Sequence, residues 1–270
     1  MTAPPPTRPC PMCGGRGALP RASIDRDGLR FSIDRCISCG FVYVTNPGGT
    51  TFDHEQVAPL AVPEKPRHRQ IKRICDIVVA RHARSGAVHR VVEVGAGWGG
   101  LAQVFARDSA WRYTGFEPSA ARAAFGRARG FDVRAGLFDA SGAAGVADAV
   151  VFDNVLEHVS EPRALVRDAV ASLRAGGVLI VIVPNRHDLR RFHPAWRDRH
   201  YWQPHCHINY FARQDLDRLF GAHGMKLRFF GFEAVGGLSD DAGLLPRVLA
   251  DRVGLHLLGL NTYGVKPGAA

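Results

Sequence analysis

The chain has 270 residues, of which 46% are hydrophobic and 22% are charged, and this ordinary globular mixture excludes a wholly disordered protein. The longest uninterrupted apolar run covers residues 178–183, far short of the roughly 20 residues that a membrane-spanning helix needs, and the first residues carry no signal-peptide-like apolar stretch. We therefore expect a soluble cytoplasmic protein with no membrane partner. The net charge of +10 is compatible with an anionic partner such as nucleic acid, but charge alone indicates only non-specific attraction.

Four of the six cysteines form two matching CxxC-Gly pairs near the start of the chain: Cys10, Cys13, Cys36 and Cys39. Two residues between thiolates allow a tight turn to direct both sulfurs at one ion, so two such turns predict a structural tetrathiolate zinc site. A redox dithiol is the alternative, but it needs only one pair. We expect a zinc-knuckle module over residues 1–50, with short strands at FSIDR and FVYV, and a linker over residues 51–65.

Residues 66–270 alternate between apolar strands and amphipathic helices. A first helix is expected from Pro66 to Arg84, because its apolar residues recur at helical spacing. The expected strands are HRVVEV, RYTGFEP, FDVRAG, DAVVFDN and GVLIVIVPN, and the helices between them are GGLAQVFARD, SAARAAFGRARG and EPRALVRDAVASLRAGG. Continuous Val/Ile runs that alternate with helices indicate an α/β fold with a parallel sheet covered on both faces.

A glycine-rich loop joins the first of these strands to its helix in the segment VVEVGAGWGG. Glycines let the backbone approach a ligand closely and place the N–H groups of a helix start at its edge. Gly95, Gly97 and Gly100 match the dinucleotide pattern GxGxxG, and Glu117 supplies the acidic residue for ribose hydroxyls. Glu93 distinguishes between a dinucleotide and S-adenosylmethionine as the cofactor. A carboxylate is unfavourable beside the pyrophosphate of a dinucleotide, but it suits the ammonium and sulfonium groups of S-adenosylmethionine.

Four motifs in order resemble those of class I S-adenosylmethionine-dependent methyltransferases: EVGAGWG, Glu117-Pro118, FDNVLEHV and LRAGGVLIVIVPN. The resemblance covers residues 66–235. It implies a Rossmann-like seven-stranded sheet of order 3-2-1-4-5-7-6 whose last strand is antiparallel, with MKLRFFGFEAV and LHLLGLNTYGVKP as the two terminal strands. Residues 66–270 would then form the S-adenosylmethionine-binding methyltransferase domain.

The resemblance also implies which residues bind S-adenosylmethionine. The glycine loop would lie against the methionine part, Glu93 would orient its amino group, and Glu117 would bind the ribose hydroxyls. Phe138 would flank the adenine, or it is a core residue instead. The end of the fourth strand would line the reacting end of the cofactor. The complete implied set is Glu93, Gly95, Ala96, Gly97, Gly99, Glu117, Pro118, Phe138, Asn154 and Val155.

His158 follows the fourth strand, whose carboxyl end faces the ligand crevice in an open α/β sheet. Methyl transfer to a hydroxyl benefits from a base, and an imidazole with a pKa of about 6.5 suits this role. The alternative is that Glu157 and His158 only support the following helix. Some relatives hold a divalent metal with Glu-x-x-Glu-His, but Asn154 replaces the first glutamate here, which argues against a catalytic metal.

The segment from His187 to Phe211 follows the fifth strand, where an acceptor-binding lid would fall. It contains His-Cys-His at residues 205–207. This triplet is similar to a set of metal ligands, but adjacent side chains diverge along an extended chain. Relatives share an H-x-N-Y-F stretch before the next helix, and this resemblance implies that His207 is an acceptor-pocket residue, which we count as a second catalytic residue. Aromatic side chains of the segment form either a platform for a sugar or a packed lid: Trp196, Tyr201, Trp202 and Tyr210. Its arginines suit an anionic acceptor: Arg186, Arg190, Arg191, Arg197 and Arg199.

These patterns favour a small-molecule or glycan methyltransferase that acts on a hydroxyl oxygen, with S-adenosylmethionine and a structural zinc as cofactors. The main alternative is an RNA methyltransferase that grips phosphates through the knuckle and its arginines. Sugar C-methyltransferases with an N-terminal cysteine knuckle are also similar, as are enzymes that methylate a glycan such as the oligosaccharide of mycofactocin. The intact glycine loop and Glu117 argue against a non-enzymatic interaction protein. No motif identifies the acceptor or the oligomeric state.

Overall fold

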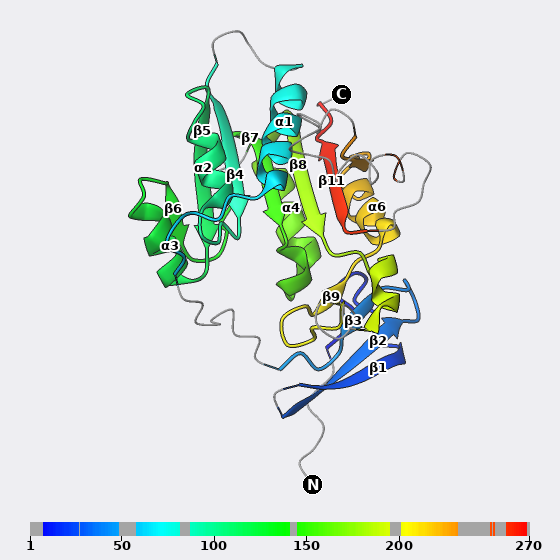
Figure 1. The fold of residues 1–270 in the computed structure, drawn as a ribbon. Helices are drawn as coiled ribbons and strands as arrows, with labels where there is room; N and C mark the ends of the chain where they lie inside the picture. Colours follow the sequence, from blue (N-terminus) through cyan, green and yellow to red (C-terminus); the bar gives the residue numbers. More distant parts are fainter. Residues whose placement is uncertain are drawn as a thin grey trace.

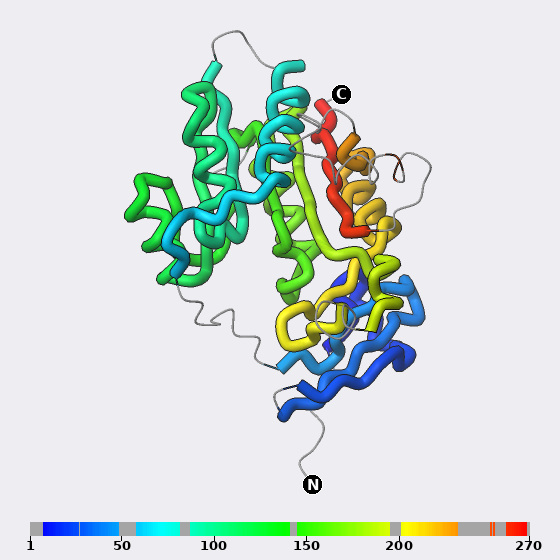
Figure 2. The backbone as a smooth tube through the Cα atoms, in the orientation of Figure 1, coloured from blue at the N-terminus to red at the C-terminus, as the bar shows by residue number. Residues whose placement is uncertain are grey.

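The computed structural model of the protein has two β-sheets, and one hydrophobic cluster contains residues from both parts (Figure 1). The structure describes residues 8–26, 28–48, 58–81, 87–140, 145–194, 201–231, 249, 251 and 258–268. The backbone trace shows the N-terminal sheet, in blue, beside the yellow segment that follows the fifth strand of the larger sheet (Figure 2). Two parts of the chain that are distant in sequence therefore meet at one end of the molecule.

The larger sheet has seven strands in the order β10-β11-β8-β7-β4-β5-β6. Five neighbouring strands are parallel, and β11 runs antiparallel to both β8 and β10. The predicted order 3-2-1-4-5-7-6 is confirmed. The strands are β4 (His89–Val94), β5 (Trp111–Glu117), β6 (Val133–Ala135), β7 (Ala147–Asp153), β8 (Leu173–Val183), β10 (Arg228–Phe229) and β11 (Leu260–Val265).

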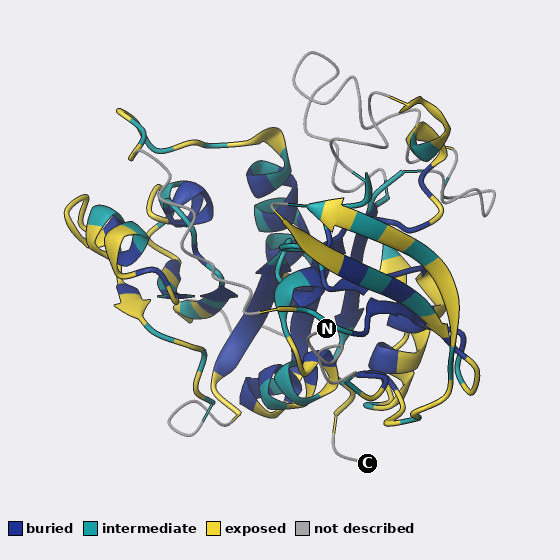
Figure 3. Ribbon diagram, turned by 90° about the horizontal axis from the view of Figure 1, so that it is seen from below, coloured by how far each residue is buried: buried dark blue, intermediate teal, exposed yellow. Residues whose placement is uncertain are grey.

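Helices cover both faces of this sheet. Because both faces are buried, apolar residues do not alternate with polar ones along its Val/Ile-rich strands, as β7 illustrates. Successive strand side chains point to opposite faces. Ala149 and Val151 pack in the cluster that contains the apolar side of α1, whereas Val150 and Phe152 pack with α4 and α6. Figure 3 shows the central strands buried between these layers. The helices are α1 (Pro66–Ala80), α2 (Gly100–Phe105), α3 (Ala120–Arg127), α4 (Pro162–Ser172) and α6 (Arg213–Gly221).

The smaller sheet carries the N-terminal cysteine pairs and has the order β1-β2-β3-β9. The strands expected at FSIDR and FVYV lie in β2 and β3, and β9 comes from the segment after β8. Phe41 and Phe211 are fully buried with ring centroids 5.2 Å apart, so the two sheets share one core. The strands are β1 (Ala18–Arg26), β2 (Leu29–Cys36), β3 (Val42–Val44) and β9 (Asn209–Tyr210).

The ends of three predicted elements differ from the structure. Helix α4 ends at Ser172 rather than at the glycine pair, because Leu173 already pairs with Ala147 as the first residue of β8. Helix α1 ends at Ala80. In the segment MKLRFFGFEAV only β10 is a strand, while residues 232–235, and residues 255–257 of the last predicted strand, lie outside the described residues. No helix among the described residues has both the length and the apolar character that a bilayer crossing requires.

Replacing Phe41 with alanine tests the shared core. Its ring is completely buried between the cysteine pairs and Phe211, so we expect the free energy of unfolding to fall by about 3–5 kcal/mol. Urea denaturation measures this loss. The matched control is Leu29→Ala in the same small sheet, where the side chain is 56% exposed and little change is expected. Equal stability of the two variants would show that the module and the larger sheet do not share a core.

Candidate active site

The glycine-rich loop leaves β4 and is tied to the end of the neighbouring strand. The N–H groups of Gly95 and Ala96 donate to the carbonyl oxygen of Phe116 at 2.8 and 3.0 Å. Gly95 has a φ of 77°, and a Cβ there would lie 2.7 Å from Val155 Cγ2. Gly97 has a φ of 54°, but among the described residues nothing lies within 4 Å of the corresponding Cβ position. The loop backbone is therefore bare at Gly97, as a ligand-binding turn requires.

Glu117 is the last residue of β5, and its carboxylate fixes the glycine-rich loop by a hydrogen bond. It is 4% exposed. Its Oε2 accepts a hydrogen bond from the Gly97 N–H at 2.8 Å, and its Oε1 accepts one from the Ser119 N–H at 2.9 Å. Each carboxylate oxygen has a second lone pair, so Glu117 can position the loop and still accept hydrogen bonds from a ligand. Pro118 beside it is exposed.

Glu93, directly ahead of the loop, is buried and accepts a hydrogen bond from the Tyr113 hydroxyl. Burial raises the pKa of Glu93 well above its usual range; the Tyr113 hydrogen bond opposes this shift, and the nearby carboxylates of Asp153 and Glu117 add to it. Three carboxyl groups thus influence one another in a region of low dielectric, which favours a bound cation. Tyr113 was missed by the sequence analysis, because only the pairing of β4 with β5 brings it to Glu93.

Asp153 ends β7 and is bound by the start of α1. Its Oδ2 accepts a hydrogen bond from Arg67 Nε at 2.7 Å and lies 3.5 Å from His68 Nε2. Burial alone raises the pKa of Asp153, but His68 and Arg67 outweigh it and hold the pKa below its usual value. The second oxygen, Oδ1, is buried without a hydrogen-bond partner among the described residues. Helix α1 therefore closes over the carboxyl ends of the strands, a contact that no local sequence signal indicated.

Asn154 turns the chain sharply away from β7. In the described part of the chain it is the one non-glycine residue with a positive φ, 55°, a conformation that asparagine tolerates better than most residues. The turn places Val155 against Gly95 and leads into the short helix η1 (Leu156–His158). Phe138 packs edge-on against Phe116 with ring centroids 5.2 Å apart, and it also contacts the main core.

Two imidazoles meet beyond the end of β7. The rings of His158 and His207 are arranged edge to face with centroids 4.9 Å apart. Burial lowers the pKa of His158; burial and the nearby charges of His158 and His205 lower the pKa of His207 to about 3. Both rings are thus neutral near pH 7. His207 is a weak proton acceptor, but a neutral imidazole can still bind a donor or a cation.

Glu157 lies behind these histidines and is 1% exposed. Burial raises the pKa of its carboxyl group to about 8. Neither oxygen has a hydrogen-bond partner among the described residues, and Oε1 lies 3.8 Å from Nε2 of His158. An ionised carboxyl group is costly at such a buried position, and the raised pKa lets protonation relieve this cost near pH 7 when no cation is bound.

The segment before β9 is a turn rather than the extended chain expected from its sequence. The N–H groups of Cys206 and His207 both donate to the Gln203 carbonyl oxygen, at 3.0 and 2.7 Å. Adjacent side chains therefore need not diverge, and Cys206 lies close to both His158 and His207.

The aromatic residues that the structure describes in this segment are packed together. The Trp202 ring lies 4.5 Å from Tyr201 and 4.9 Å from Tyr210, and Tyr210 is buried against the small sheet. Trp196, Arg197 and Arg199 lie outside the described residues.

The three arginines of this segment that the structure describes make contacts within the protein itself. Arg186 donates to the Gly40 carbonyl oxygen at 3.0 Å, and Arg190 pairs with Asp188 at 2.6 Å. Arg191 donates to the backbone of Arg186 at 2.6 Å. These contacts occupy groups that the sequence analysis assigned to an anionic acceptor.

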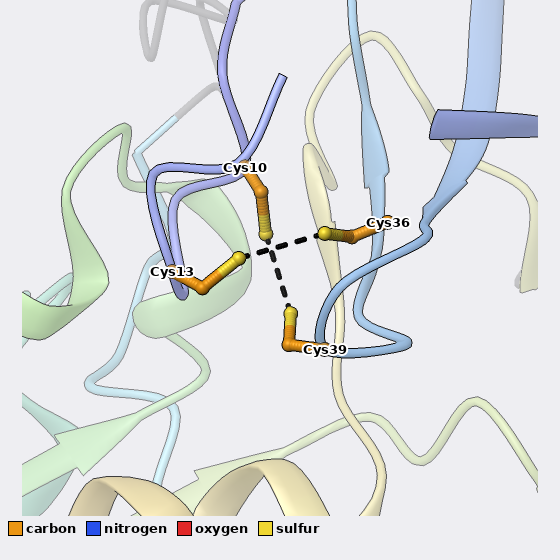
Figure 4. A group of neighbouring side chains, drawn as sticks. All are labelled: Cys10, Cys13, Cys36 and Cys39. Atoms are coloured by element: carbon orange, nitrogen blue, oxygen red, sulfur yellow. Dashed lines mark hydrogen bonds between the residues drawn. The ribbon is translucent and has the colours of Figure 1, made fainter. Parts of the chain in front are cut away.

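The four cysteines of the N-terminal module form a cluster in which the four sulfur atoms face one another (Figure 4). Cys10 Sγ is 3.6 Å from Cys39 Sγ, and Cys13 Sγ is 3.5 Å from Cys36 Sγ. Sulfurs around a tetrahedral zinc ion are about 3.8 Å apart, given a Zn–S distance of about 2.3 Å. All four thiols are unpaired by disulfides, so the donor set and its spacing fit zinc.

The sheet order, the glycine loop and the acidic residue that ends β5 together define an S-adenosylmethionine-dependent methyltransferase. The family model described as "Methyltransferase domain" matches residues 67–228, more than half of the chain. The chain belongs to this family. No curated protein matches its sequence.

Solved structures share the fold at low sequence identity. The YcgJ protein from Bacillus subtilis is 14% identical with a TM-score of 0.50, over 75% of this chain and 100% of its own. The [4+2]-cyclase SpnF is 24% identical with a TM-score of 0.47, over 73% and 82%. Geranyl diphosphate C-methyltransferase from Streptomyces coelicolor is 17% identical with a TM-score of 0.48, over 74% and 80%. Likeness at this level concerns the fold alone.

Replacing Gly95 with alanine should weaken S-adenosylmethionine binding at least roughly tenfold, because the new Cβ would collide with Val155 and displace the loop. The matched control is Gly130→Ala. Gly130 has a similar φ of 82° but no atom within 4 Å of its Cβ position, so alanine there adds about 1–2 kcal/mol of backbone strain without a collision. Titration calorimetry compares the two, and equal affinities would contradict the role of this contact.

Proposed function

We propose that this methyltransferase transfers the methyl group of S-adenosylmethionine to a hydroxyl oxygen of a small molecule or glycan, with His158 and His207 as its catalytic residues. The observation that supports the proposal is the pair of neutral imidazoles in contact beyond the end of β7. His158 closely follows Asn154 and Val155, where the family pattern places the reacting end of the cofactor, and the turn before β9 brings His207 against it.

The cofactor in this proposal lies across the glycine loop. Glu117 binds the ribose hydroxyls with the lone pairs that its two backbone hydrogen bonds leave available, while Gly97 and Gly99 allow close approach of the methionine part. The buried carboxyl groups of Glu93 and Asp153 face the positively charged ammonium and sulfonium groups. The remaining contacts come from Gly95, Ala96, Pro118 and Phe138.

The transfer itself is an in-line displacement. The acceptor oxygen attacks the methyl carbon, the carbon–sulfur bond breaks, and its electron pair stays on the sulfur of the thioether product. Alignment of the two reactants supplies much of the rate. The hydroxyl proton must also leave, and His158 and His207 lie where that proton is lost. A pocket closed by the packed Tyr201–Trp202–Tyr210 cluster would exclude water from this end.

The four-cysteine cluster is proposed to hold a structural zinc ion. Four protein thiolates leave no open coordination position, so the ion stabilises the small sheet and takes no part in the transfer. We propose the cytoplasm as its compartment, because the cluster needs reduced thiols.

Glu117→Ala tests the cofactor site. The variant should lose S-adenosylmethionine binding by at least roughly a hundredfold, because removal of the carboxylate frees the loop at Gly97 and deletes the ribose acceptor. Glu117→Gln is the matched control: it keeps one carbonyl acceptor and should retain part of the affinity. Calorimetry measures both, and unchanged binding by Glu117→Ala would overturn the proposed cofactor position.

Cys36→Ser tests the structural zinc. Cys36 is buried in the core shared by the two sheets, so loss of the ion should lower the melting temperature by about 10 °C, or roughly 3 kcal/mol. The control is Cys75→Ser, which changes a buried thiol of α1 outside the cluster and should leave the zinc content unchanged. If Cys36→Ser binds as much zinc as the unmodified chain, the four-cysteine site is not the zinc site.

A further inference from the structure

A second group of metal-binding side chains lies next to the proposed catalytic end. One donor atom each from His158, Cys206 and His207 lie within 4.8 Å of one another. Within the ranges that the structure describes, the four-cysteine cluster is the only other group of this kind.

The backbone converges on this point from two directions. Helix η1 carries His158 off the end of β7, and the turn closed by the Gln203 carbonyl presents Cys206 and His207 in succession. The Ile208 N–H donates to the Glu157 carbonyl oxygen at 2.8 Å and joins the two segments. Main-chain hydrogen bonds therefore bring the three donors together, rather than chance contact between exposed side chains.

The ring of His158 is oriented as it is in many metal sites. Its Nδ1 lies 2.8 Å from the Cys206 carbonyl oxygen. Because a carbonyl oxygen only accepts, Nδ1 carries the hydrogen and Nε2 carries the lone pair. Metal-binding histidines commonly donate their other ring nitrogen to a backbone carbonyl, which fixes the tautomer and the ring orientation.

Glu157 is the second, independent observation. Its carboxyl group is buried, and in the part of the chain that the structure describes neither oxygen has a hydrogen-bond partner. Oε1 is 3.8 Å from Nε2 of His158. Isolated negative charge in the interior is unfavourable unless a cation or a hydrogen-bond donor compensates it. A dication held by the neighbouring donors would supply that compensation.

We propose that His158, Cys206 and His207 bind a catalytic zinc ion, separate from the structural zinc, and that Glu157 compensates its charge. Imidazole and thiolate donors suit zinc, and three protein ligands leave one position open for the substrate. Donors around one zinc ion are about 3.3–3.8 Å apart, so the group closes on the ion with side-chain shifts of roughly 1 Å. These three ligands do not include Asn154. At that position some relatives have a metal-binding glutamate, and its replacement by asparagine was the reason why the sequence argued against a catalytic metal.

The inference rests on the proposed function and specifies its chemistry. The open position takes the hydroxyl oxygen of the acceptor, and the positive charge of the ion lowers the pKa of that hydroxyl. The hydroxyl proton is released to bulk water, and the ion stabilises the alkoxide that remains. The oxygen then attacks the methyl carbon of the cofactor, and the carbon–sulfur electron pair leaves with sulfur. His158 and His207 act in this step by holding the ion.

Zinc content tests the site without any assay of activity. The full chain, saturated with zinc and then desalted, should contain two zinc ions per molecule by mass spectrometry. Cys206→Ser and His207→Ala should each contain one. His205→Ala is the matched control, because His205 belongs to the same turn but not to the cluster, and it should retain two.

Two further measurements make the result decisive. Calorimetric binding of S-adenosylhomocysteine by each variant verifies that its cofactor domain is folded. In the cobalt-substituted protein, Cys206→Ser should lose the share of thiolate-to-cobalt absorption contributed by the second site. A single zinc ion in the unmodified chain, with no decrease in folded Cys206→Ser or His207→Ala, would overturn the proposal. Two zinc ions in a protein that methylates nitrogen or carbon would instead refute only the proposed hydroxyl acceptor.

Discussion

Two backbone pairings between β3 and β9, Val42 with Tyr210 and Tyr43 with Asn209, join the cysteine module to the methyltransferase sheet. Arg8 reinforces the join, because its guanidinium donates to the Val44 carbonyl oxygen at 2.8 Å and to that of Ile208 at 2.7 Å. The turn that ends in His207 comes immediately before β9. The position of the proposed catalytic residue therefore depends on this sheet, and the proposed structural zinc would have an indirect part in function by stabilising it.

The proposed cofactor site and the proposed acceptor site differ in their charged groups. Glu93, Glu117 and Asp153 are buried carboxyl groups near one another, and only some of their charge is met by Arg67 and the loop N–H groups. Such a region is stable when a cationic ligand occupies it. The proposed acceptor end instead has two neutral imidazoles beside the carboxyl group of Glu157, which has no hydrogen-bond partner within the described ranges. A sulfonium cofactor on one side and a dication on the other would satisfy both regions.

The sequence predicted features whose signals are local. Val/Ile runs predicted the strands of the large sheet, and CxxC spacing predicted the grouped thiols, because each depends on neighbouring residues. Contacts formed only by tertiary packing were missed: the Tyr113 hydroxyl on Glu93, the Arg67 guanidinium on Asp153, and the β3–β9 pairing. The extended chain assumed at residues 205–207 was wrong, because the Gln203 carbonyl closes a turn there. Pro204, the second residue of this turn, is a local turn signal that the sequence interpretation did not use. Assignment of individual site residues to cofactor and acceptor stays a prediction.

The most direct test of the account is to follow the transferred methyl group. The purified protein would be incubated with S-adenosylmethionine carrying a carbon-13 methyl group and the metabolite extract of the source organism, and the labelled product would be identified by nuclear magnetic resonance. The account predicts a methyl ether in the small-molecule or glycan fraction. Label found in RNA, or on a nitrogen or carbon atom of the product, would contradict it.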